Sequence, residues 1–158
     1  MREYTYTIIT RKDPFLFPVA YLFPIELDVE RMNEGAGLLL EYTDFECFSK
    51  VRTQVANFRC ELNFSEWNQN QHILQYTIRS DRFLRNMVRS IVGTLLDLGR
   101  QKITLNDLKA ILLSHDRRKA GRSVPAKGLM LTDIRYPADI FVQTPEWFSY
   151  ESLEEINP

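Results

Sequence analysis

The sequence predicts a single α+β domain in which helices cover one face of a four-stranded, mainly antiparallel sheet. A chain of 158 residues, 44% of them hydrophobic, is long enough to bury one core and short for two. Some segments alternate apolar and polar residues as strands do, and others repeat apolar residues every three or four positions as helices do. Their order, βαββα(α)β, is that of ferredoxin-like domains once the shorter second helix is set aside.

The first elements are a strand, a connection and a helix. Tyrosine, threonine and isoleucine alternate through residues 3–9, a period of two in residue types that favour strands. Segment 11–24 holds three prolines and several aromatics, which is typical of an extended, partly buried connection. Asp28 is then placed to cap a helix that runs to Leu39, although two interior glycines weaken it.

Two further strands are expected at residues 58–64 and 72–79, joined as a hairpin by the polar segment 65–71. The apolar face of the first of them would hold Phe58, Cys60, Leu62 and Phe64. The sheet face away from the helices needs polar side chains if it stays open to solvent. The candidates for that face are Thr5, Thr7, Gln75, Thr77 and Arg79.

The last three elements are two helices and a strand. A long helix is predicted from the cap-like pair Ser80–Asp81 to Gly99, because apolar residues recur through it at helical spacing. A shorter helix follows over 104–115 and begins with a capping box. The segment "GLMLTDIRYP", residues 128–137, is the last strand.

Arginines gather at the beginning of the predicted long helix. Arg82, Arg85 and Arg89 would share one narrow sector beside its apolar stripe, where like charges repel one another. Cations near a helix N-terminus also oppose the helix dipole. A cluster that costs stability locally indicates an anionic partner, and a solvated polar face is the simpler alternative.

The net charge of −1 conceals an uneven distribution along the chain. Residues 79–135 carry 13 basic and 5 acidic residues, whereas residues 1–78 carry 7 and 11, and residues 136–158 carry 0 and 5. The basic block includes the loop "HDRRKAGRSVPAKG", with five cations against one aspartate. Such a block is expected of a protein that binds nucleic acid or phosphate.

Several classes of site and location are disfavoured. No apolar run is long enough to cross a membrane and no secretory leader precedes the first strand, so a cytoplasmic protein without membrane contact is expected. Cys47 and Cys60 match neither a disulfide framework nor a zinc spacing, which predicts reduced, packed thiols. His72 and His115 have no Cys or Glu pattern beside them, so no metal site is predicted.

The order and spacing of five segments resemble the C-terminal half of the tRNA pseudouridine synthase A family. They are "YTY", "DFECF", "DRFLRNMVRSIVGTLLDLG", "DRRKAG" and "AKGLMLTDIRYP". The long helix motif, a phenylalanine followed by Met-Val-Arg and Val-Gly, is the most specific of them. The resemblance implies that residues 1–141 form a C-terminal synthase domain and that residues 142–158 form an acidic tail.

The resemblance implies an enzyme that isomerises uridine to pseudouridine in the anticodon stem-loop of tRNA, without a metal or organic cofactor. In the family an aspartate attacks the target nucleotide, the glycosidic bond breaks, and the uracil is turned and reattached through carbon. The base must leave its stack, which calls for a stacking surface and phosphate clamps. A homodimer is a further family expectation.

The family also implies roles for individual residues. Tyr4 matches an aromatic residue that contacts the target base, although from the residues alone a plain sheet or core tyrosine is the favoured interpretation. Arg89 matches the basic catalytic residue that pairs with the nucleophilic carboxylate, and Gly93, one turn further on, is expected to leave space beside it. The residues assigned to tRNA phosphates are Arg82, Arg85, Asn86, Arg122 and Lys127.

One family motif is absent. The catalytic aspartate of the family lies in a Gly-Arg-Thr-Asp motif, which does not occur in this sequence. The chain is therefore expected to be a C-terminal fragment that works with an N-terminal catalytic domain of the same protein and is inactive alone.

Two alternatives come from other functional classes. A non-enzymatic RNA-binding module with a four-stranded sheet would read bases with an aromatic strand motif that is not found here. A ferredoxin-like regulatory or oligomerisation domain would need no basic block.

Overall fold

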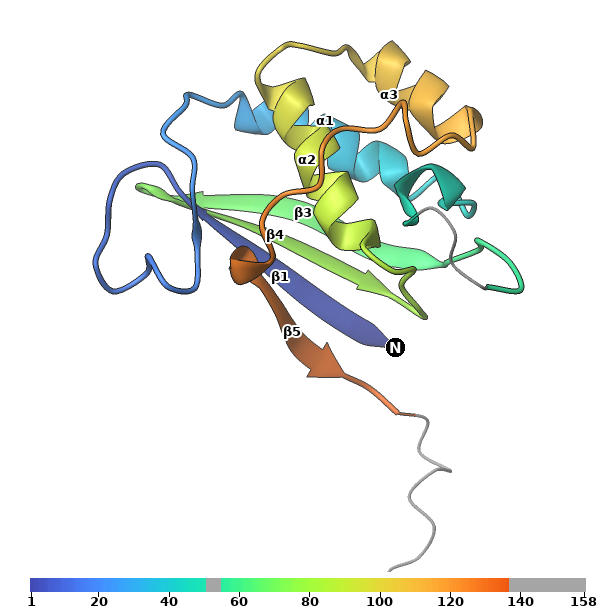
Figure 1. Cartoon of the computed structure of the whole chain (residues 1–158), viewed down its shortest axis with the longest axis horizontal. Helices are drawn as coiled ribbons and strands as arrows, with labels where there is room; N and C mark the ends of the chain where they lie inside the picture. The colour runs from blue at the N-terminus through green and yellow to red at the C-terminus, as the bar shows by residue number, and fades with distance from the viewer. Residues whose placement is uncertain (51–54, 137–158) are drawn as a thin grey trace, which may run out of the picture.

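The computed structural model describes residues 1–50 and 55–136 and confirms the α+β class. Figure 1 shows one sheet with the helices gathered on one of its faces. The expected acidic tail 142–158 lies outside the described residues. No helix in the described part is long and apolar enough to cross a membrane.

The strand β1 (Arg2–Ile9) is the centre of the sheet. It pairs antiparallel with β4 (Ile73–Ser80), which pairs antiparallel with β3 (Leu62–Asn70). Its other edge pairs antiparallel with β5 (Leu129–Ile134) and, at its far end, in parallel with the short strand β2 (Tyr21–Leu22). Apart from β2, which lies within the expected extended connection, this is the antiparallel four-stranded arrangement that the sequence predicts.

The two faces of the sheet differ as expected. Tyr6 is fully buried under the helices, whereas on the opposite face the Thr5 hydroxyl lies 3.5 Å from Thr77 Oγ1 and 3.4 Å from Thr132 Oγ1. Arg79, on that same open face, pairs with Glu3 and lies over the ring of Phe64. The predicted polar face is therefore confirmed.

The hairpin prediction was wrong in its boundaries. Segment 65–71 is not a long turn: β3 continues to Asn70, and the turn consists of Gln71, at φ 53°, and His72. Ser65 and Trp67 are buried, and the residues next to them are more exposed. Buried and exposed side chains therefore alternate along this segment as in a regular strand, although most of its residues are polar. An irregularity in the pairing at Leu62/Phe64 sends Phe64 to the open face, away from the face expected for it.

Two helices begin and end near the predicted positions. Helix α1 (Val29–Leu39) is capped by Asp28, whose Oδ1 accepts a hydrogen bond from the Arg31 amide at 3.0 Å. Helix α3 (Leu105–Leu113) begins with the predicted capping box of Thr104 and Asp107. Short 3₁₀ helices, η1 (Glu46–Phe48) and η2 (Ala126–Gly128), complete the elements.

The long helix α2 (Met87–Gly99) ends where the sequence predicts but begins later. Ser80 is still paired in β4, and the Asp81 carboxylate accepts from the amides of Glu61 and Arg82, each at 2.7 Å, instead of capping a helix. Arg82 and Arg85 therefore precede the helix, and the predicted sector of three helical arginines was wrong. Of these three arginines, only the third lies on α2.

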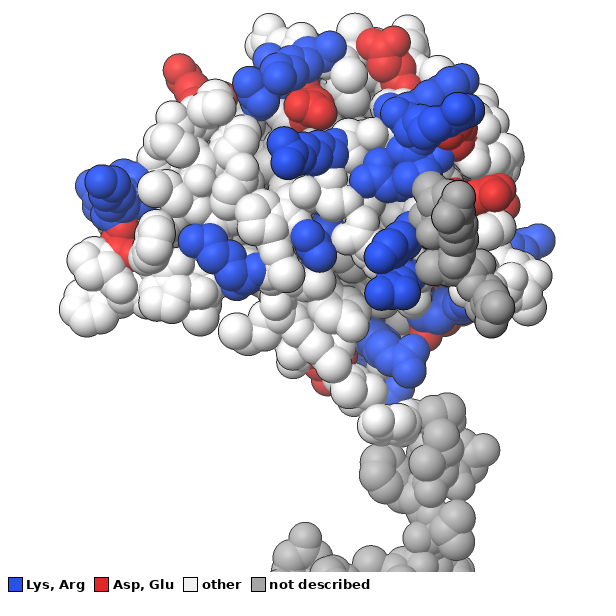
Figure 2. All heavy atoms as spheres, in the orientation of Figure 1, with Lys and Arg blue, Asp and Glu red and all other residues white. Residues whose placement is uncertain are grey.

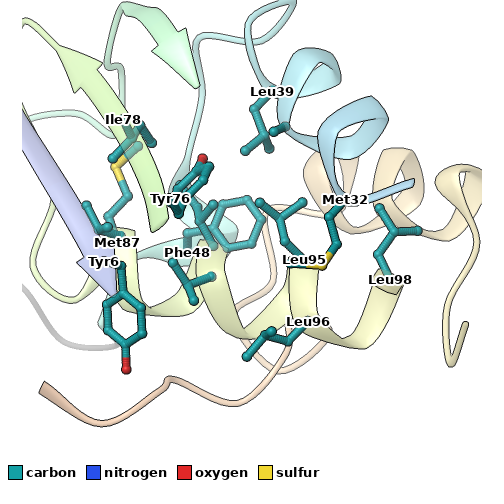
Figure 3. Close-up of a cluster of buried hydrophobic side chains, with 14 of the residues drawn as sticks. Tyr6, Met32, Leu39, Phe48, Tyr76, Ile78, Met87, Leu95, Leu96 and Leu98 are labelled. Atoms are coloured by element: carbon teal, nitrogen blue, oxygen red, sulfur yellow. The ribbon is translucent and has the colours of Figure 1, made fainter. Parts of the chain in front are cut away.

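The hydrophobic core lies between the sheet and the helices, and Figure 3 shows a cluster of its buried side chains. Residues from every layer meet there: Tyr6, Tyr76, Met32 and Leu95 are all fully buried. Cys47 and Cys60 are free thiols inside this core, which confirms that they are packed.

The loop before η2 packs directly against α2. A Cβ atom at Gly93 would lie 1.8 Å from the carbonyl oxygen of Arg122, and one at Gly121 would lie 2.8 Å from Thr94 Cα. The Thr94 hydroxyl accepts from the Gly121 amide at 2.8 Å. The space expected beside Gly93 is thus filled by backbone, because only a residue without a Cβ allows so close an approach.

We expect Gly93→Ala to lower the free energy of unfolding by about 2 kcal/mol or more, because the methyl group must displace the loop backbone. Gly37→Ala is the matched control: Gly37 lies in α1, and a Cβ atom added there would meet nothing within 4 Å, so alanine should stabilise by about 0.5–1 kcal/mol. Urea denaturation of both variants measures this. Equal effects of the same sign would contradict the loop packing.

Burial also sets the reactivity of the two thiols. It raises the pKa of Cys47 to about 12 and that of Cys60 to about 11. At pH 8 both are therefore protonated, and we expect a disulfide reagent such as DTNB to label neither in the folded protein and both in urea. Labelling of the native protein as fast as the denatured one would contradict this.

Candidate active site and nucleic-acid interface

The structure brings the two predicted active-site residues together. Tyr4 on β1 and Arg89 on α2 line the same cavity of about 410 Å³, here named the Tyr4 cavity. The Tyr4 ring is partly exposed and makes an edge-on contact with Phe83, with ring centroids 5.1 Å apart. Tyr4 is therefore a sheet tyrosine that packs against the edge of the core and also forms an aromatic wall of this cavity.

Arg89 is held from one side and free on the other. Its Nε donates to the carbonyl oxygen of Val124 at 2.6 Å, and the Val124 amide donates back to the Arg89 carbonyl at 3.2 Å. Within the described part of the chain, its two Nη groups make no hydrogen bond and no carboxylate lies within ion-pair distance. A half-buried guanidinium fixed in this way is suited to orient an incoming carboxylate.

Other walls of the Tyr4 cavity were missed by the sequence reasoning. Phe83 and Leu129 both line it, and Leu129 is the first residue of β5. A Cβ at Gly128 would lie 2.8 Å from Thr7 O, so this glycine lets η2 approach β1 closely. Gly128, at the start of the predicted last strand, was a signal in the sequence that another segment approaches closely here. The sequence does not show that this segment is β1.

A hydrogen-bond network fixes the loop that carries Val124. Asn86 Nδ2 donates to Ser123 Oγ at 2.6 Å and to Ser90 Oγ at 3.2 Å. Arg117 Nη2 donates to the same Ser123 hydroxyl at 2.9 Å, and its Nη1 donates to the Gly121 carbonyl at 3.1 Å. Asn86 thus uses its amide inside the protein, and Arg117, which the sequence reasoning had counted only as one of the loop's cations, braces the loop.

Tyr6 supports the same loop from beneath. Its hydroxyl donates to the Pro125 carbonyl at 2.7 Å, and burial raises its pKa, so the hydroxyl stays protonated as a donor. The loop is therefore bound to both β1 and α2.

The remaining predicted phosphate ligands lie at the surface. Arg82 Nη1 contacts Asn57 Oδ1 at 3.3 Å, and Lys127 Nζ donates to Phe17 O at 3.2 Å while lying 4.2 Å from the Phe17 ring centroid. Arg85 and Arg122 are exposed, and among the described residues their side chains have no hydrogen-bond or ion-pair partner. Figure 2 shows a face on which basic side chains outnumber acidic ones, as the basic block predicts.

Both histidines lie beside carboxylates that the sequence reasoning did not expect. His72 Nε2 is 3.1 Å from Asp13 Oδ2, and His115 Nδ1 is 3.2 Å from Asp44 Oδ1 and 3.8 Å from Glu46 Oε2. The second group is the set of described residues that could hold a metal ion. Its Asp44 Oδ1 already accepts from the Glu46 amide at 2.9 Å, and these partly exposed groups are explained without an ion.

Comparisons with known proteins identify the family of the chain. A family model described as tRNA pseudouridine synthase matches residues 42–137. The chain is 46% identical over 140 residues to tRNA pseudouridine synthase A of Parabacteroides distasonis, covering 89% of this chain and 56% of that protein. It is 46% identical over 143 residues to the protein of the same name from Bacteroides thetaiotaomicron, covering 89% and 53%.

A more distant relative shows the same pattern. The tRNA pseudouridine synthase A of Bacillus subtilis is 38% identical over 137 residues, which cover 85% of this chain and 56% of that protein. The chain thus spans about half the length of the curated relatives it matches. With the family match and these identities, the chain belongs to the tRNA pseudouridine synthase A family.

Proposed function

We propose that this chain is the tRNA-binding, active-site-completing C-terminal domain of an enzyme that isomerises uridine to pseudouridine in the tRNA anticodon stem-loop. The observation that carries the proposal is the Tyr4 cavity: Arg89 is fixed beside Tyr4 with free Nη groups and no carboxylate partner among the described residues. The greater length of the relatives supports a nucleophilic aspartate in an N-terminal domain. As a family expectation, the whole protein is a cytoplasmic homodimer.

The residues of this chain bind and orient the substrate in that reaction. Tyr4, backed by Phe83, offers a surface for the extruded uracil, and Leu129 closes the apolar side. Arg89 pairs with the aspartate, which keeps the carboxylate ionised and aimed at the nucleotide. The N1–C1′ bond breaks and a C5–C1′ bond forms, while C5 loses a proton and N1 takes one up, so the product is an isomer of the substrate.

The surface cations account for tRNA binding. Arg82, Arg85, Arg122 and Lys127 would contact phosphates, and Asn86 would act with them by holding the Ser123 loop in place. The open sheet face argues against a non-enzymatic RNA-binding module, because it carries threonines and a phenylalanine covered by Arg79 instead of a row of exposed aromatics.

We expect the isolated chain to form no pseudouridine, since the nucleophile lies outside it. The assay is tritium release from tRNA labelled at C5 of uridine, with the full-length synthase as the positive control. Release by a preparation freed of host synthase would contradict the proposal.

In the full-length synthase, Arg89→Ala should remove most turnover and leave tRNA affinity nearly unchanged, because its guanidinium orients the nucleophile. Arg85→Ala should weaken binding and reduce the salt slope by about one unit, with turnover at saturating tRNA preserved. Arg89→Lys keeps the charge but loses the planar fork, so it should stay impaired.

Melting temperatures must accompany these rates, because Arg89 also anchors the Val124 loop. A folded Arg89→Ala variant with parental turnover, together with an inactive Arg85→Ala variant, would reverse the assigned roles.

A further inference from the structure

A second cavity, here named the Tyr21 cavity, is also lined by Arg89. Its volume is about 430 Å³, within the range of small-ligand sites. Arg89 lines both this cavity and the Tyr4 cavity, so the two are neighbours that share one side chain as a wall. The proposed reaction uses only the Tyr4 cavity.

Two aromatic rings form one side of the Tyr21 cavity. The ring centroids of Tyr21 and Phe23 are 5.5 Å apart, and both rings are partly exposed. Their backbone is fixed, since Tyr21 pairs with Ile8 in the sheet and the Phe23 amide donates to the Ile9 carbonyl at 2.8 Å. The backbone that carries these two rings is therefore held in place before any ligand arrives.

Cations also line this cavity. Arg100 lies 5.7 Å from the Phe23 ring centroid, and Arg122 is exposed with no side-chain partner among the described residues. Apart from Arg89, which the proposed reaction already uses, the lining thus has two arginines against one acid, Asp97, which lies 3.9 Å from Arg100. An aromatic pair and an excess of positive charge are the two features that bind a base and its phosphate.

We propose that the Tyr21 cavity holds the nucleotide adjacent to the target uridine, with its base stacked on Tyr21 and its phosphate on Arg122. The proposal rests on the proposed function, which places the target uridine in the Tyr4 cavity. Successive nucleotides are joined through a single phosphate, and Arg89 lines both cavities. In this proposal, a substrate strand with its target uridine in the first cavity places the adjacent nucleotide in the second.

The test is a double-mutant cycle between protein and RNA, using the full-length synthase and an anticodon stem-loop RNA. The RNA is intact or carries an abasic residue directly 5′ or directly 3′ of the target uridine. Tyr21→Leu removes the ring and keeps an apolar side chain. Phe15→Leu is the matched control, because Phe15 is 90% exposed and does not line the cavity.

We expect Tyr21→Leu to weaken binding of the intact RNA by about fivefold or more, and to have no effect on the RNA that is abasic on the occupied side. Phe15→Leu should show no such coupling. Additive effects of Tyr21→Leu with both abasic RNAs would overturn the proposal. If the parent synthase forms no pseudouridine in the intact RNA, the proposed function is wrong, and this outcome is distinct from a failure of the Tyr21 proposal.

A second variant keeps the test decisive if Tyr21→Leu fails to fold. Arg122 is exposed, so Arg122→Gln should melt like the parent, and it should weaken binding of the intact RNA. An uncharged methylphosphonate at the phosphate between the two nucleotides should abolish this effect. If Arg122→Gln weakens both RNAs equally, or neither, the phosphate assignment is wrong.

Discussion

The contact between two glycines and the backbones opposite them is the constraint on which the rest of the site depends. Gly93 on α2 and Gly121 on the following loop let the loop run directly against the helix. The loop then places the Val124 carbonyl where it accepts from Arg89 Nε at 2.6 Å. A side chain at either glycine would lift the loop, and the guanidinium between the two cavities would lose its anchor.

The helix that carries this contact is unusually enclosed, and its start is held in a costly conformation. Eleven of the 13 residues of α2 are buried, so the core fixes its position on nearly every side. Asn86, the residue before it, has φ 68°, which costs about 1 kcal/mol even though asparagine tolerates it better than most residues. Its amide hydrogen bonds to Ser90 and Ser123 offset that cost. The backbone turn therefore sends Arg85 outward while Arg89 stays inside.

The cations of the basic block differ in burial, and their proposed roles differ accordingly. Arg85 and Arg122 are exposed, which suits phosphate contacts that are made and released in solvent. Arg89 is half-buried and already oriented, so a partner carboxylate meets a guanidinium that has little rotational freedom left to lose. Arg117 donates its hydrogen bonds to Gly121 and Ser123 of the loop itself. A basic residue in this block is therefore not by its charge alone a phosphate ligand.

The sequence by itself determined the element order, the Asp28 and Thr104 caps and the apolar stripe of α2, because hydrophobic period and capping act between residues a few positions apart. Through its family resemblance it also indicated Tyr4 and Arg89 as active-site residues. Only the tertiary structure decided where α2 begins, how far β3 extends and that a second cavity adjoins the first. The start of α2 depends on the left-handed backbone of Asn86, and the length of β3 depends on its pairing register with β4. The second cavity depends on the packing of a loop against α2, and no local sequence pattern specifies these features.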